Sequence, residues 1–201
     1  KRDLALVVNV GPQRCAAGVF TSNRFQAAPV VWSMSALAGG ELDAVVLNSG
    51  GANACTGAEG LADASAMAEA TAAAVNTEAG RVAVCSTGLI GVRLPLDAIR
   101  GGIADAAHHA SADGGAAAAE AIMTTDTVSK QAAVTSEAGW TVGGMAKGAG
   151  MLAPSLATML VVLTTDAELP ADALQGALRE ATRLSFDRAD SDGCMSTNDT
   201  V

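Results

Sequence analysis

Short runs of apolar residues, each bounded by small or polar residues, recur along the chain and are typical of buried strands. Residues 43–48 and 82–85 are the clearest, and each run leads directly into a loop of mostly small residues. A hairpin is predicted over 131–142, because Glu137-Ala138-Gly139 is typical of a turn. Further strands are expected within 4–20, as a pair around Gly11-Pro12, in the Val/Leu-rich residues after 158, and at 197–201.

Apolar residues spaced three and four apart predict helices between these strands. They cover residues 61–80, 95–107, 115–123 and 170–184. The helix that follows Pro170 is expected to bury one face, made of Leu174, Leu178, Ala181 and Leu184. The alternation of elements predicts an α/β fold, a layered sandwich of mixed β-sheets flanked by helices, with residues 1–201 forming one domain.

The composition limits both the core and the partners. Of 201 residues, 50% are hydrophobic but only 2% are aromatic, so the core must be built from small and branched aliphatic side chains. The formal net charge of −9 makes a nucleic-acid or anionic-membrane surface improbable and favours cationic or zwitterionic small molecules.

Two further features bear on location. The longest uninterrupted apolar run, Met159 to Leu163, is far shorter than the about 18 residues that a membrane span needs. The four cysteines are scattered without a CxxC pair, which suits a reducing cytoplasm and argues against a zinc site. We expect a cytoplasmic protein, and we interpret Lys1 and Val201 as boundaries within a longer chain.

The glycine-rich segment 143–150 is the most unusual stretch of the sequence. It can be a flexible turn with Lys147 in solvent. Alternatively, Gly148, Gly150 and Ala153 satisfy the G-x-G-x-x-G/A pattern of dinucleotide sites, although Pro154 and the apolar run that follows do not suit the helix such a site requires.

Several long motifs then point to one family. They occupy residues 47–57, 85–91, 121–127, 147–154, 157–160 and 196–200. In this order they resemble the ornithine acetyltransferases, also called bifunctional glutamate N-acetyltransferases, of arginine biosynthesis. Members of that family run well past a position equivalent to Val201, so the resemblance covers only about their first half.

The resemblance implies self-cleavage between Ala157 and Thr158, giving segments 1–157 and 158–201 with a new amino-terminal threonine. A threonine hydroxyl is a poor nucleophile unless a base removes its proton. Once Thr158 begins a chain, its own α-amine, with a reference pKa of about 7.7–8.0, can act as that base. Without the resemblance, Thr158 is simply a β-branched residue that opens a strand.

The resemblance also implies further site residues. Thr87 and Gly88 match the oxyanion hole, whereas Lys147 and Thr124, together with Thr158, match positions that bind the amino-acid substrate. An ammonium can pair with a substrate carboxylate, and hydroxyl and backbone N–H groups can stabilise an oxyanion. The alternatives remain an ordinary Ser-Thr-Gly turn at 86–88 and a helix-end hydroxyl at Thr124.

The expected activity is transfer of an acetyl group from N-acetylornithine to glutamate through an acetyl-threonine intermediate, with acetyl-CoA as a possible further donor. No metal or organic cofactor is expected, and the resemblance implies a dimer of processed heterodimers. An amidase or aminopeptidase on the same scaffold, a dinucleotide-binding domain and a noncatalytic domain remain alternatives.

The remaining polar residues are not expected to carry chemistry. His108 and His109 are adjacent on a helix and therefore point about 100° apart, so we interpret them as surface residues. Asp187, Asp190 and Asp192 do not fit a calcium loop, because the required Gly and Glu positions are missing.

Overall fold

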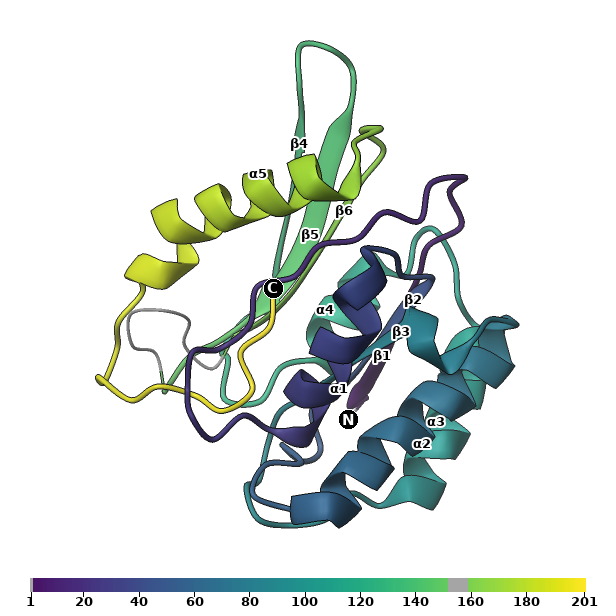
Figure 1. Ribbon diagram of the computed structural model, residues 1–201, viewed down its shortest axis with the longest axis vertical. Helices are drawn as coiled ribbons and strands as arrows, with labels where there is room; N and C mark the ends of the chain where they lie inside the picture. Colours follow the sequence, from purple (N-terminus) through teal and green to yellow (C-terminus); the bar gives the residue numbers. More distant parts are fainter. Residues whose placement is uncertain (1, 152–158) are drawn as a thin grey trace.

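The fold is built on two three-stranded sheets, seen in a computed structural model that describes residues 2–151 and 159–201 (Figure 1). The first sheet has the order β1-β2-β3, with β1 antiparallel and β3 parallel to β2. The second is an antiparallel meander in the order β4-β5-β6. The strands are β1 Leu4–Val8, β2 Ala44–Asn48, β3 Val82–Ser86, β4 Lys130–Thr135, β5 Thr141–Lys147 and β6 Leu160–Thr165.

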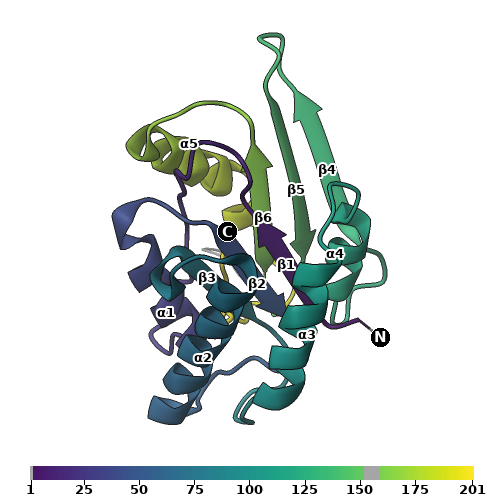
Figure 2. The ribbon, with the colours of Figure 1, turned by 90° about the vertical axis from the view of Figure 1, so that its right-hand side faces the viewer.

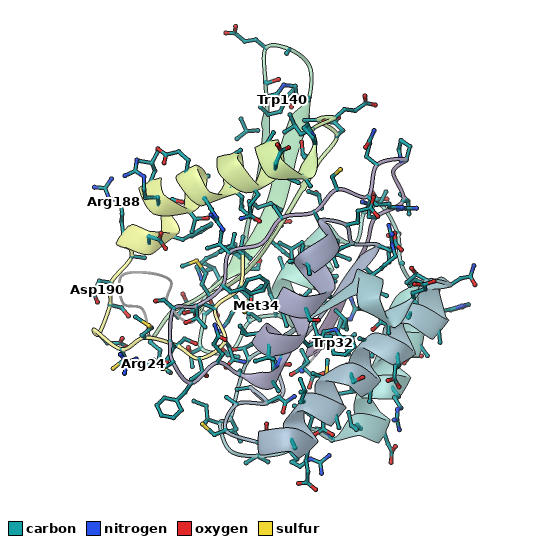
Figure 3. All side chains as sticks on the ribbon, in the orientation of Figure 1. Arg24, Trp32, Met34, Trp140, Arg188 and Asp190 are labelled. Carbon is teal, nitrogen blue, oxygen red and sulfur yellow. The ribbon has the colours of Figure 1, made fainter. Side chains whose placement is uncertain are left out.

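Three helices cover the outer face of the first sheet. They are α1 Ala28–Ala36, α2 Gly57–Val75 and α3 Leu96–His108. Alternate strand residues such as Val46 and Val84 pack against Met67 of α2 and Ile103 of α3. Trp32 of α1 packs against the same cluster and donates its Nε1–H to the carbonyl of Val82 at 3.0 Å (Figure 3).

The other face of the first sheet packs against the second sheet and against α4, Gly115–Ala121. Leu47 and Cys85 meet Met145 and Leu160 there. The opposite face of the second sheet contributes Val161 to a small cluster with Leu178 of α5, Ala171–Leu184. Helices α1, α2, α3 and α5 therefore lie outside two packed sheets, and the predicted fold class is confirmed (Figure 2).

Most predicted elements form, but two predicted strands do not. Of residues 4–20, only β1 is a strand, and Cys15 and Phe20 make single bridges to Glu41 and Thr200. Residues 197–201 likewise form no strand, and among the described residues they make isolated bridges at Thr200, to Phe20 and to Leu160. These segments make their backbone hydrogen bonds with several different partners, so no continuous ladder develops.

The helices also differ in detail from the prediction. The sequence pattern missed α1, which is apolar on most sides, so it shows little helical periodicity. Helix α2 ends before Asn76, which adopts a left-handed conformation (φ 60°), and not at Gly80. The predicted inner face of α5 is partly wrong, because Ala181 and Leu184 are exposed and Thr182 is buried instead.

The hairpin and the lengths of the helices complete the description. The hairpin of β4 and β5 projects beyond the helices and carries Trp140 near its tip (Figures 1 and 3). Among the described residues, no helix is both long and apolar enough to cross a membrane.

Candidate active site

The candidate site begins where the parallel strands β2 and β3 end. Asn48 and Ser86 are in register as the last residues of these strands, so the two loops that follow begin side by side. The Asn48 side chain donates to Ser86 Oγ at 2.8 Å, and the Thr87 N–H donates to the Asn48 carbonyl at 2.9 Å. The backbone that leads into Thr87 is therefore fixed by two hydrogen bonds.

Gly88 lies directly against the neighbouring loop. Its φ of +131° is a conformation that residues with a Cβ rarely adopt. A Cβ at this position would lie 2.9 Å from the nitrogen and 3.0 Å from the Cα of Gly51. The absence of a Cβ at Gly88 thus allows the two loops to approach each other closely.

Lys147 reaches this point from the end of β5. Its side chain is almost completely buried, with 2% of the residue exposed, and its Nζ donates to Thr87 Oγ1 at 3.2 Å. A hydroxyl that accepts one hydrogen bond still has its own proton to donate. The lysine thus leaves the Thr87 hydroxyl able to donate to a developing negative charge, and the interpretation of Lys147 as a solvated lysine in a flexible turn is wrong.

Thr124 is joined to the end of β5 through Asp126. The carboxylate of Asp126 accepts hydrogen bonds from the backbone N–H groups of Thr124 at 3.3 Å and Gly148 at 2.8 Å, and it forms an ion pair with Lys130. Burial acts to raise the pKa of Asp126, but the Lys130 ammonium and the two N–H donors outweigh it and lower the pKa below its ordinary value.

The segment 196–201 supplies two buried residues that the sequence did not identify as part of a site. Asn198 Nδ2 donates to the carbonyls of Ala52 at 2.6 Å and Ser86 at 2.8 Å, and so bridges the loops that follow β2 and β3. Asp199 is fully buried, and its Oδ1 accepts the N–H of Met159 at 2.9 Å. Only their place in the STNDT motif gave any sign of them.

Burial has a large effect on the acidity of Asp199. It raises the pKa of this carboxyl to about 6, although the Met159 N–H, the hydroxyls of Ser196 and Thr21 and the charge of Lys147 all favour the ionised form. Ionisable groups whose pKa is strongly shifted by burial are common at functional sites.

A small cavity of about 20 Å³ lies at the junction of these segments. It is lined by Ala52, Thr87, Gly88, Ile90, Met151, Ser196, Thr197 and Asn198. A larger pocket of about 290 Å³ lies between the start of α1 and the start of α2, and none of the predicted site residues that the structure describes lines it. The predicted oxyanion residues therefore face a concave surface that the 196–201 segment helps to form.

The whole chain, residues 1–201, matches the family model described as the ArgJ family. The chain belongs to the ArgJ family. It is 67% identical over 199 residues to the arginine biosynthesis bifunctional protein ArgJ of Streptomyces coelicolor, and 61% identical over 201 residues to that of Thermobifida fusca. The alignments cover 99% and 100% of this chain but 52% of each relative, so the chain spans about half the length of these ArgJ proteins.

Two solved ArgJ structures have the same fold. The crystal structure of ornithine acetyltransferase complexed with ornithine from Mycobacterium tuberculosis matches with a TM-score of 0.73 and 57% identity, over 81% of this chain and 84% of that chain. The ArgJ structure from Bacillus halodurans matches with a TM-score of 0.67 and 40% identity, over 79% and 83% of the respective chains.

The remaining predicted residues fall into two groups. Ala157 and Thr158 lie outside the described residues, as does Ala153 of the dinucleotide pattern. His108 and His109 are exposed, as predicted for surface residues. Burial raises the pKa of the Cys85 thiol to about 12, so this thiol is not a reactive thiolate at neutral pH. Within 2–151 and 159–201, no group of three or more His, Cys, Asp or Glu residues is placed to hold a metal ion.

The dinucleotide interpretation fails on topology. That motif requires a strand, a glycine-rich turn and then a helix whose N-terminus meets the phosphates. Here Gly148 follows β5, but the next described element is β6, a strand that pairs antiparallel with β5.

Proposed function

We propose that this chain is the part of an ornithine acetyltransferase that carries the nucleophile and the oxyanion hole. The full enzyme moves an acetyl group from N-acetylornithine to glutamate. The observation that carries the proposal is the hydrogen bond from Lys147 to Thr87, because it joins the end of β5 to the loop predicted to hold an oxyanion, in a chain of the ArgJ family.

The first step is the cut between Ala157 and Thr158. The Thr158 hydroxyl attacks the carbonyl carbon of Ala157 and forms an ester as the peptide C–N bond breaks. Water then hydrolyses the ester, which leaves the Ala157 carboxylate and a free α-amine on Thr158. The nucleophile and its base then belong to one residue.

Supporting evidence for a cut comes from the lengths of the solved chains. Each matches about four fifths of this chain, and residues 1–157 make up about that share of it. Each is also close to this chain in length, whereas the ArgJ relatives are about twice as long. A protein cut near its middle into two chains accounts for both observations.

Acetyl transfer uses the same groups. The amine of Thr158 takes the proton of its hydroxyl while Oγ1 attacks the acetyl carbon. The Thr87 hydroxyl and the Gly88 N–H stabilise the negative charge on the acetyl oxygen. The ammonium returns the proton to the departing amine of ornithine, and the amine of glutamate then attacks the acetyl ester to give N-acetylglutamate and regenerate Thr158.

Substrate recognition is assigned to Lys147 and Thr124, with Thr158 contacting the substrate as well. A buried lysine ammonium is a strong partner for an α-carboxylate, because little water competes for it. The hydrogen bond to Thr87 supports a second task for Lys147, that of orienting the oxyanion donor.

The wider properties belong to the same proposal. The chemistry requires no metal or organic cofactor, and acetyl-CoA is a possible alternative donor. The processed segments remain together, and two such heterodimers form the enzyme in the cytoplasm.

The test uses the full-length protein. We expect wild type to give two bands on a denaturing gel, Thr158→Ala to give one, and Thr158→Ser to retain some cutting. Cleavage of the Thr158→Ala variant would remove Thr158 from the scheme. Measuring acetylglutamate against free acetate separates a transferase from an amidase, because an amidase passes the acetyl group to water.

A further inference from the structure

The small cavity beside the oxyanion turn is lined by segments whose backbones are bonded to one another. The Ala52 N–H donates to the carbonyl of Leu89 at 2.9 Å. The Gly91 N–H donates to the carbonyl of Ala54, also at 2.9 Å, so the residue between Leu89 and Gly91 is held on both sides. Asn198 Nδ2 ties the 196–198 segment to the same two loops. The walls of the cavity are therefore in place before a ligand binds.

The lining combines apolar side chains with polar groups that already form hydrogen bonds within the protein. The apolar members are Ala52, Ile90 and Met151. Asn198 Nδ2 donates to two backbone carbonyls, and Ser196 Oγ accepts the Asn198 N–H at 3.1 Å. The Thr87 hydroxyl accepts from a lysine and keeps its own proton to donate. A ligand that suits this lining presents one acceptor oxygen and an aliphatic group, as an acyl group does.

The volume of the cavity limits the length of that aliphatic group. A cavity needs at least about 10–15 Å³ to hold one water molecule. The volume here is about 20 Å³, which admits one group of similar size. A methyl group meets this limit, whereas an ethyl group needs room for a second carbon.

Ile90 is the apolar residue best able to enforce the limit. Its β-branched side chain is stiff at χ1, whereas the unbranched side chain of Met151 adapts to its surroundings. Ala52 presents only a Cβ. We propose that the cavity receives the methyl group of the acyl donor while Thr87 and Gly88 bind the acyl oxygen, and that Ile90 restricts the enzyme to short acyl chains.

This inference rests on the proposed function, because it places the acyl group of the same donor beside the same oxyanion turn. One extra methylene in an apolar site changes kcat/KM by about 10–200-fold. We therefore expect the full-length wild-type protein to use N-acetylornithine with a kcat/KM about 10–200 times that for N-propionylornithine. The measurement is the N-acylglutamate formed from each donor.

Ile90→Ala tests the residue itself, because it removes every carbon beyond Cβ. The ratio of kcat/KM for the acetyl donor to that for the propionyl donor should fall about tenfold, through faster propionyl transfer. General damage to the enzyme does not move this ratio, since both donors share the ornithine part and the reacting groups. Ile90 is 48% exposed, so the variant keeps its core. Ile90→Val, which removes only Cδ1, should shift the ratio the same way by less.

Leu89→Ala is the matched control. Leu89 is the neighbouring apolar residue, is 69% exposed, and is not among the described residues that line the cavity. This variant should keep the wild-type ratio. Equal use of the two donors by wild type, an unchanged ratio in both Ile90 variants, a fall due only to slower acetyl transfer, or an equal fall in Leu89→Ala overturns the inference.

The same assay separates this failure from failure of the proposed function. A full-length enzyme that acetylates glutamate but gives one of those four results loses only the acyl-length role of Ile90. An enzyme that transfers neither acyl group to glutamate overturns the proposed function, and the role of Ile90 with it.

Discussion

Replacement of Gly88 by alanine tests whether the close approach of the two loops shapes the oxyanion turn. The new Cβ would stand 2.9 Å from the Gly51 nitrogen and 3.2 Å from the Gly50 carbonyl carbon, both of which are backbone atoms that cannot rotate away. The backbone would also have to keep, or abandon, a φ of +131°.

Gly88→Ala should lower the free energy of unfolding for two reasons, the backbone conformation and the steric contact. A residue with a Cβ in a sparsely populated backbone region costs about 1–3 kcal/mol. The contact with Gly51 adds the cost of overpacking, about 1–3 kcal/mol. Gly91→Ala is the matched control, since Gly91 lies in the same loop at φ +80° but nothing lies within 4 Å of the added Cβ.

Thermal unfolding of the full-length variants measures the difference. The overpacking cost alone should place the Tm of Gly88→Ala about 1–4 °C below that of Gly91→Ala, at about 1 °C per kcal/mol for a full-length protein about twice as long as this chain. Gly88→Ala should also lose most acetyl transfer, because the Gly88 N–H moves. Equal Tm values for the two variants would refute the packing argument.

Three further outcomes are expected. Arg93→Ala leaves the buried carboxylate of Asp63 without its partner and should cost about 3 kcal/mol in urea unfolding, whereas Arg183→Ala, from an exposed pair, should cost below about 1 kcal/mol. Burial raises the pKa of Asp199 to about 6 in the folded state, so the free energy of unfolding of wild type should fall by about 2–3 kcal/mol relative to that of Asp199→Asn as pH rises from about 4 to about 6. A difference in unfolding free energy that stays constant over this pH range would contradict that pKa. Thr87→Val should lower kcat about 10²-fold, whereas Thr87→Ser should have a kcat close to that of wild type. A Thr87→Val variant with the kcat of wild type would exclude the Thr87 hydroxyl as an oxyanion donor.

The sequence predicted the elements whose pattern is local. The strands β2 and β3 and their loops follow from apolar runs that end in small residues, and the position of Thr87 beside the end of β2 follows from parallel pairing. Helix α1 was missed because a helix that is apolar on most sides has no polar face to reveal its period.

The support of the site depends on contacts between distant residues, which no local pattern encodes. Asn198 bonds Ala52 and Ser86 across 146 and 112 positions, and Asp199 bonds Met159 across 40. Lys147 could be assigned to the site only through the family resemblance, since a lysine among glycines is ordinarily solvated. Its burial results from tertiary packing at the end of β5.

Mass spectrometry of the processed enzyme, incubated with N-acetylornithine in the absence of glutamate, tests the central claim most directly. The account predicts a second chain that begins at Thr158 and carries one acetyl group as an ester on the Thr158 hydroxyl, which glutamate then removes. A chain that runs uncut through Ala157-Thr158 in active enzyme, or an acetyl group on any other residue, would contradict it.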